Sequence, residues 1–96
     1  MDESEISVQD NSARHRYEIY VDGALAGFSA YRDEPGRRVI THTKIDDDFE
    51  GQGIGSALAR GALDDVRRKD VAVVPRCPFI AGYISRHPDY ADLVAR

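Results

Sequence analysis

Three glycines at alternate positions form the segment most suited to binding a ligand. They stand in Glu50-Gly51-Gln52-Gly53-Ile54-Gly55-Ser56, between an expected strand and an expected helix. Glycine adopts backbone conformations that other residues avoid, and it lets a ligand approach the main chain. The first turn of a helix adds unpaired N–H groups and the positive end of the helix dipole. The segment therefore predicts a phosphate-binding loop.

The residues after the glycines separate this loop from two other phosphate-binding motifs. A P-loop ends in Gly-Lys followed by Ser or Thr, whereas Gly55 is followed by Ser56 and Ala57. The dinucleotide motif G-x-G-x-x-G fails because position 56 is serine, and no βαβ unit precedes the loop. A nucleotide-binding domain is therefore disfavoured, and the alternative without any ligand is a simple glycine-rich connection.

Antiparallel strands are expected before the loop. The pattern predicts a weak edge strand at residues 5–10 and clearer strands at 14–21, 25–31 and 38–45. Asp22-Gly23 is typical of a two-residue hairpin turn, and a second turn is expected at residues 33–36. Gly27, inside a strand, indicates a bulge or a close backbone approach. Alternation along the last of these strands places Val39, Thr41, Thr43 and Ile45 on one face and Ile40, His42 and Lys44 on the other.

The spacing of apolar residues changes after the loop. Ile54, Leu58, Ala62 and Val66 recur every four residues, which predicts a helix of about four turns. Residues 71–74 predict a buried strand ended by Pro75, residues 78–85 a shorter helix, and residues 90–94 a last helical turn. The order β-β-β-β-α-β-α predicts an α+β fold with a mostly antiparallel sheet, formed by residues 1–96 as a single domain.

Composition excludes several classes of function. The 96 residues are 42% hydrophobic and 31% charged, as in a soluble globular domain. The net charge of −4 argues against broad nucleic-acid binding. One cysteine and three scattered histidines show no spacing for a metal site, and no disulfide can form within the chain. The acidic N-terminus lacks a leader pattern and no apolar run would span a membrane, so a cytoplasmic monomer is expected.

The segment from His42 to Leu63 resembles the acetyl-CoA motif of GNAT acetyltransferases, in which Arg or Gln is followed by x-x-Gly-x-Gly or Ala. Gly53 and Gly55 match the two small positions, whereas Glu50 stands where the family has Arg or Gln. A carboxylate beside a pyrophosphate is unfavourable, so we expect Glu50 to point to solvent.

A wider resemblance covers nearly the whole chain. Several motifs in the same order are similar to a family of minimal GNAT-like N-acetyltransferases, which lack the usual N-terminal helices of the superfamily. The motifs are His42-Thr43, the glycine loop, Val74-Pro75-Arg76-Cys77-Pro78-Phe79, Tyr83 and His87-Pro88-Asp89-Tyr90.

This resemblance implies a GNAT-like sheet with a central acetyl-CoA-binding helix and acetyl-CoA as the cosubstrate. The strand before the loop would splay from the next strand and pair with the pantetheine through Thr43, Lys44 and Ile45. The pyrophosphate would lie on the main chain of the loop from Gly51 to Ser56. Phe79 and Tyr83 would line the pantetheine channel or simply pack on the sheet, and Tyr83 would also suit the tyrosine that protonates the leaving thiolate.

Two residues are candidates for the chemistry that the resemblance implies. Cys77 follows the strand where the thioester is expected, and three roles are open: nucleophile, weak hydrogen-bond donor, or small buried residue. His42 would deprotonate an ammonium group or activate Cys77, unless it is simply a packed histidine.

These interpretations lead to one expected function and one alternative. The expected function is an acetyl-CoA-dependent N-acetyltransferase that acts on an amine of a small molecule or a protein. The alternative is a non-catalytic CoA-binding or protein-interaction module on the same scaffold. The net acidity and the run Asp46-Asp47-Asp48 suit a cationic amine, although a solvated turn explains that run more simply.

Overall fold

The elements follow the predicted order along residues 5–95, which the computed structural model describes; residues 1–4 of the acidic N-terminus and residue 96 lie outside the described part. No α-helix occurs between residues 5 and 53, in agreement with the expected lack of N-terminal helices. The strands are β1 (Ile6–Asn11), β2 (Arg16–Val21), β3 (Ala24–Glu34), β4 (Arg37–Ile45) and β5 (Ala72–Pro75). The α-helices are α1 (Ile54–Arg68) and α2 (Pro78–Arg86), and the short 3-10 helices are η1 (Ser12–Arg14), η2 (Asp47–Phe49) and η3 (Pro88–Leu93).

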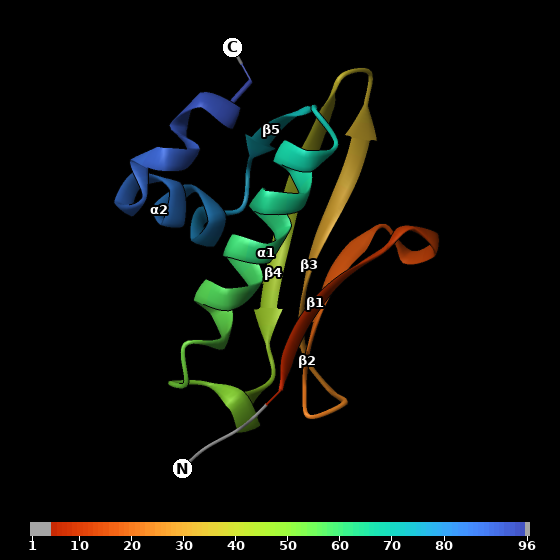
Figure 1. The fold of residues 1–96 in the computed structure, drawn as a ribbon, viewed down its shortest axis with the longest axis vertical. Coiled ribbons are helices and arrows are strands. Elements are labelled where there is room, and N and C mark those ends of the chain that lie inside the picture. The colour runs from red at the N-terminus through yellow and green to blue at the C-terminus, as the bar shows by residue number, and fades with distance from the viewer. Residues whose placement is uncertain (1–4, 96) are drawn as a thin grey trace.

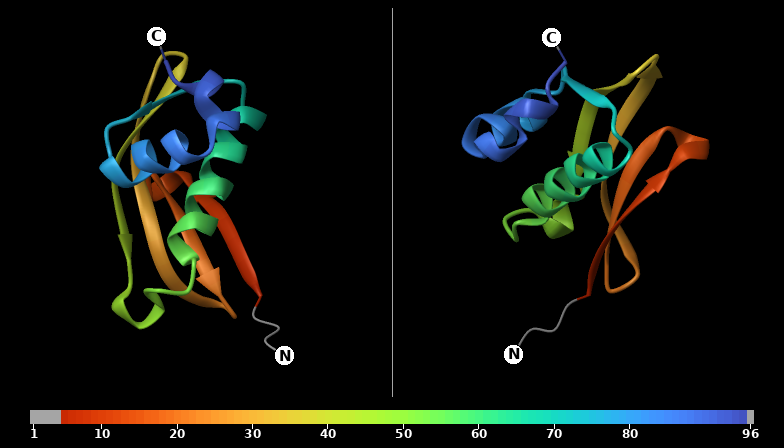
Figure 2. Two further views of the ribbon diagram at one scale, coloured as in Figure 1. Left: turned by 90° about the vertical axis from the view of Figure 1, so that its left-hand side faces the viewer. Right: turned by 45° about the horizontal axis from the view of Figure 1, so that its top comes forward.

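Both α-helices pack on one face of a five-stranded sheet (Figures 1 and 2). The strand order is β1-β2-β3-β4-β5, and only the pair β4–β5 is parallel. The face that α1 and α2 cover is called the inner face here, and the opposite one the outer face. This arrangement confirms the predicted α+β fold with a mostly antiparallel sheet. Among residues 5–95, no helix is both long enough and apolar enough to cross a membrane.

The two hairpin turns differ in how well the sequence predicts them. Asp22 and Gly23 have φ of 51° and 85°, as expected for a tight turn between β2 and β3. The turn predicted at residues 33–36 is too long, because β3 continues to Glu34 and β4 already begins at Arg37. Cross-strand ion pairs extend the ladder: Arg38 donates two hydrogen bonds to Asp33, and Arg37 donates one to Glu34.

Gly27 is required for close packing between strands. A Cβ at this position would lie 2.7 Å from Cδ1 of Ile45 and 2.7 Å from the carbonyl oxygen of Lys44. The ladder between β2 and β3 also shifts here, because Ile19 pairs with Gly27 but Tyr20 pairs with Leu25. Both predicted features, the bulge and the close approach, are therefore present.

A second bulge changes the faces of β4. Ala30 pairs with His42 and Tyr31 with Ile40, so Thr41 is an extra residue in the ladder. The predicted faces are therefore wrong relative to Ile40, because one extra residue exchanges the two sides of every residue after it. The predicted separation of Thr43 and Ile45 from His42 and Lys44 is confirmed. Thr43 and Ile45 share the inner face with Ile40, whereas His42 and Lys44 belong to the outer face.

The core lies between the inner face and α1. Fully buried side chains of α1 include Leu58, Ala62 and Val66, as the four-residue periodicity predicts. Gly61 of the same helix lies against Val8 of the edge strand β1: a Cβ on Gly61 would be 2.7 to 2.9 Å from three side-chain atoms of Val8. The edge strand is thus in van der Waals contact with the helix backbone.

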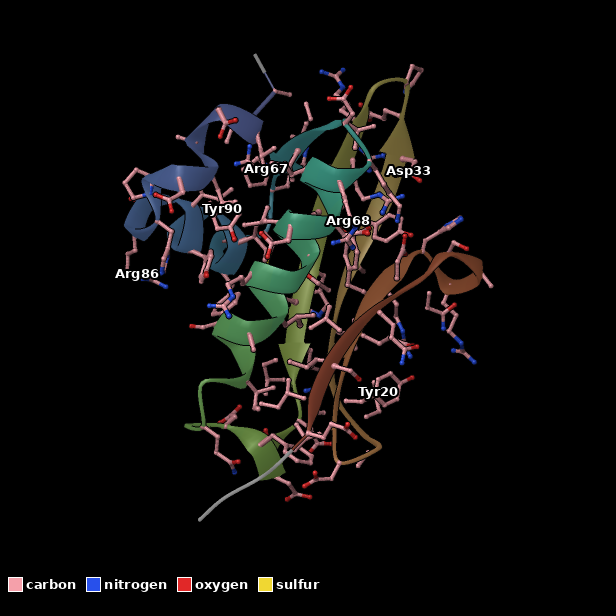
Figure 3. All side chains as sticks on the ribbon, viewed as in Figure 1. Tyr20, Asp33, Arg67, Arg68, Arg86 and Tyr90 are labelled. Atoms are coloured by element: carbon pink, nitrogen blue, oxygen red, sulfur yellow. The ribbon has the colours of Figure 1, made fainter. Side chains whose placement is uncertain are left out.

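A buried polar network joins the sheet to the C-terminal end of α1. The Tyr17 hydroxyl donates to Asp65 at 2.8 Å and accepts a hydrogen bond from Arg38 at 2.8 Å. Lys69 donates to both Asp65 and Asp10, at 2.6 and 2.7 Å. Burial alone would raise the pKa of Asp65, but the hydrogen bonds from Lys69 and Tyr17 outweigh it and lower that pKa. Figure 3 shows Arg68, which also binds Asp65, and Asp33, which binds Arg38, at this end of the molecule.

Candidate functional site

The parallel strands β4 and β5 separate beside the glycine loop. They pair only over four positions, from Arg37 with Ala72 to Ile40 with Pro75. The Ile40 carbonyl then accepts the N–H groups of Arg76 and Cys77, each at 3.0 Å, and the chain leaves the sheet for α2. Within the described part of the chain, no strand pairs with this edge of β4 over residues 41–45. The main-chain groups of that segment are therefore open to a ligand.

The glycine loop presents an uncapped helix terminus. Gly51 and Gly53 have φ of 81° and 74°, and a Cβ at either position would meet no atom within 4 Å. These two positions therefore need glycine for their backbone conformation, and the space beside them is open. Gly53 is the N-cap of α1 and makes no side-chain capping bond. The first N–H groups of α1 lack partners within the helix, so this terminus suits an anion.

A cavity of about 320 Å³ joins the open edge of β4 to the N-terminus of α1. Seven of the predicted cofactor-binding residues line it: Thr43, Ile45, Gly51, Gly53, Ile54, Gly55 and Phe79. A Cβ on Gly55 would lie 2.8 Å from Cζ of Phe79, so the third glycine allows this ring to lie against the helix. Phe49 and Glu50 also line the cavity. The sequence analysis did not identify these two as lining residues. Glu50 is exposed, as expected, although it borders the cavity.

Four other predicted cofactor-binding residues lie away from this cavity. Lys44 is on the outer face of β4, and the exposed Gln52 donates to the main-chain oxygen of Asp48 at 3.4 Å. Ser56 and Tyr83 line a separate hollow of about 560 Å³, bordered by β1, α1 and α2. The ring of Tyr83 is buried and stacks on His87, with ring centroids 4.0 Å apart. The structure therefore does not bring Tyr83 to the open edge of β4.

Cys77 lies on the inner face, next to the cavity. It is the N-cap of α2 and only 4% exposed. Its Sγ is 3.3 Å from Oγ1 of Thr43, within range of a weak thiol hydrogen bond, and Thr43 is 2.7 Å from Oγ of Ser29. The sequence analysis did not identify Ser29, although alternation from the buried Tyr31 places it on the inner face.

His42 lies on the outer face, so the sheet separates it from Cys77. Its ring centroid is 6.0 Å from that of Phe28, and the guanidinium of Arg16 lies 4.8 Å from the Phe28 centroid. Direct activation of Cys77 by His42 is therefore contradicted, because the bulge at Thr41 places the two side chains on opposite faces. Deprotonation of an amine by His42 stays a prediction.

Comparison with known proteins agrees with this geometry. A family model described as GCN5-related N-acetyl-transferase matches residues 16–93, which include the sheet from β2 onward, the glycine loop and both α-helices. The chain belongs to the GCN5-related N-acetyltransferase family. Membership of this family, together with the shared fold, supports acyl transfer as the type of reaction.

Individual relatives of this member of the GCN5-related N-acetyltransferase family are distant. Protein NATD1 of Gallus gallus and that of Mus musculus are each 27% identical over 85 residues, which cover 86% of this chain and 77% of theirs. A GCN5-like protein of Staphylococcus aureus, solved by NMR, has a TM-score of 0.68 at 21% identity, over 99% of this chain and 91% of that one. The crystal structure of a ribosomal-protein-alanine N-acetyltransferase of Brucella melitensis has a TM-score of 0.56 at 24% identity, over 84% and 63%. These two structures share the fold.

Proposed function

We propose that the chain transfers the acetyl group of acetyl-CoA to an amine of a small molecule or a protein. The observation that carries this proposal is the continuity of one cavity, which has the open edge of β4 at one end and the uncapped N-terminus of α1 at the other. An unpaired strand edge suits the amide groups of pantetheine, and a helix N-terminus suits a pyrophosphate. Acetyl-CoA has both groups in one extended molecule.

The residues around the cavity fit this cosubstrate. The open space beside Gly51 and Gly53 lets phosphate oxygens approach the main chain. Phe79 offers an apolar wall on the side of α2. Glu50 is the one unfavourable group, and because it is exposed it can turn towards solvent. Under this proposal the main chain of Thr43 to Ile45 holds the pantetheine, and that of Gly51 to Ser56 holds the pyrophosphate.

Acetyl transfer forms a C–N bond, breaks the thioester C–S bond and removes a proton from the amine. Acetyl-CoA supplies the activated acyl carbon. The amine must be neutral to attack, and under this proposal a ring nitrogen of His42 takes its proton when the amine approaches from the outer face. On the inner face, Cys77 would either carry the acetyl group as a nucleophile or donate a weak hydrogen bond. Direct transfer needs no covalent step at Cys77.

The position of Cys77 favours the alternative, a non-catalytic CoA-binding or protein-interaction module. The thiol is buried, hydrogen-bonded to Thr43, and separated by the sheet from His42. No pair of candidate catalytic residues is therefore in contact. This alternative shares the cavity and differs in lacking turnover.

Calorimetry with acetyl-CoA, and with ATP and NAD as controls, tests the binding part of the proposal. Saturable binding of acetyl-CoA alone is expected. The release of free CoA thiol in the presence of an amine then separates enzyme from module. Binding with turnover supports the transferase, and binding without turnover supports a CoA-binding module. No binding at millimolar acetyl-CoA refutes both of these and leaves the protein-interaction module.

A further inference from the structure

The outer face of the sheet is bare within the described residues, since both α-helices pack on the inner face (Figure 2). Four side chains from three neighbouring strands lie together on it: Arg16, Phe28, His42 and Lys44, called the outer cluster here. Arg16 and His42 are both cross-strand partners of Ala30, and Phe28 is the partner of Lys44. Contacts between rings and guanidinium join Arg16, Phe28 and His42.

The outer face is cationic although the chain is acidic. Its strand residues include four cations, Arg16, Arg32, Arg37 and Lys44, against two carboxylates, Glu18 and Glu34, so four minus two leaves an excess of two positive charges. The whole chain has a net charge of −4. The uncovered face thus has a small positive excess on an acidic chain, which gives it an electrostatic preference for an anionic partner.

One of the two carboxylates is hidden from a partner. Glu18 is only 4% exposed and accepts hydrogen bonds from Tyr20, Arg16 and Asn11, at 2.7, 2.7 and 3.2 Å. Burial alone would raise the pKa of Glu18, but these bonds outweigh it and lower that pKa. Glu18 therefore orients Arg16 across the ring of Phe28 without presenting its own charge at the surface. Tyr20, which Figure 3 labels, lies on the same strand and donates its hydroxyl to this carboxylate.

Lys44 is the most accessible cation of the outer cluster. It is exposed and forms no ion pair with any of the residues that the structure describes. Beside it lies a hollow of about 150 Å³, whose lining is mostly apolar and includes Leu25 and Phe28, with the exposed Asp46 also bordering it. A cation beside a small apolar hollow suits a carboxylate next to an apolar side chain, as in a peptide.

The outer cluster suits an acidic peptide better than a nucleic acid. Binding of single-stranded nucleic acid relies on open aromatic rings on which bases stack. Here the face of Phe28 is occupied by the guanidinium of Arg16, and the hydroxyl of Tyr20 is held by Glu18.

We propose that the outer face binds an acidic peptide segment of a partner protein and directs an amine of that segment towards the open edge of β4. His42 and Lys44 lie on β4 itself, beside the segment that β5 leaves unpaired. The docking step stands on the charge and shape of the outer face, whereas the delivery of an acceptor amine rests on the proposed function. The acceptor would thus be an amine flanked by carboxylates.

Fluorescence anisotropy with three labelled probes tests the docking step in the absence of acetyl-CoA. The probes are a Glu- and Asp-rich decapeptide with one lysine, a Lys- and Arg-rich decapeptide, and a single-stranded oligonucleotide. The test variant is Lys44→Glu, and the matched control is Arg86→Glu on α2, far from the sheet (Figure 3). Both residues are exposed, so both variants are expected to fold, and thermal unfolding verifies it.

We expect the acidic peptide to bind most tightly, and Lys44→Glu to weaken it about tenfold because one attraction becomes a repulsion. Arg86→Glu should leave the affinity unchanged, and chemical-shift changes should map to the outer strand residues. Tighter binding of either other probe, or equal effects of the two substitutions, overturns the inference. Acetyl-CoA titrations of the same proteins separate the two proposals. If the protein binds the acidic peptide but not acetyl-CoA, only the transferase is refuted. If it binds acetyl-CoA but not the acidic peptide, only the docking is refuted.

Discussion

Replacing Gly61 with alanine tests the packing of the edge strand on the central helix. Glycine inside an exposed helix is about 1 kcal/mol less favourable than alanine, so the change would normally stabilise the protein. In this structure the new Cβ would lie 2.7 Å from Cβ of Val8 and 2.8 and 2.9 Å from its two Cγ atoms. Val8 is β-branched and held in the ladder between β1 and β2, so it cannot rotate away easily.

The two effects oppose each other, and overpacking is expected to prevail. Overpacking costs about 1–3 kcal/mol, so the net loss in the free energy of unfolding should be about 1 kcal/mol. For a domain of this size that lowers the melting temperature by about 4–8 °C, which circular dichroism measures easily.

A double-mutant cycle gives the sharper result. In a Val8→Gly background, which removes the Cβ as well as both Cγ atoms of residue 8, the methyl group at position 61 has room, so Gly61→Ala should there stabilise by about 1 kcal/mol. The sign of the effect therefore reverses between the two backgrounds. A higher melting temperature for Gly61→Ala in the otherwise unaltered protein would show that β1 does not pack on α1 in this way.

Three further predictions concern the site and the buried network. Gly53→Val should abolish acetyl-CoA binding measured by calorimetry, because valine is strained at a φ of 74° and its side chain fills the space beside the loop; unchanged affinity contradicts the loop assignment. If Cys77 carries the acetyl group, mass spectrometry should find one acetyl group on it after incubation with acetyl-CoA, and Cys77→Ala should lose both label and activity; full activity of that variant leaves direct transfer. The pKa of Asp65 is lowered in the folded state, so its contribution to stability is present above the unfolded-state pKa and is lost as the pH falls below about 4. Urea unfolding of Asp65→Asn should therefore show lower stability at neutral pH and a shallower loss towards pH 2, and an unchanged pH profile would count against the network.

Features that depend on neighbouring residues were predictable from the sequence. The tight turn at Asp22-Gly23 follows from the conformations that these two residues favour, and α1 follows from its apolar periodicity. The conformation of the glycine loop belongs to the same group, because the positive φ of Gly51 and Gly53 and the start of α1 are local features. Anion binding by this loop stays a prediction.

Features that depend on distant residues were not predictable. The bulge at Thr41 arises from the register between β3 and β4, and alternation within one strand contains no sign of it. The wrong face for His42, and with it the contact with Cys77, follows from that single residue. The length of the turn after β3 depends on Arg38 reaching Asp33, and the position of Tyr83 depends on how α2 crosses α1.

The unpaired edge of β4 has a consequence for solubility. A row of free main-chain groups is a template for another strand, and so a route to aggregation. Here the open segment is limited to residues 41–45, with the bulge at one end and the acidic turn Asp46 to Asp48 at the other. Such a short, bent edge has room for the few amides of a ligand but offers little pairing to a foreign strand, and a bound ligand would cover it further. The bulge that sets the faces of β4 thus also marks one end of the short edge that a foreign strand could pair with.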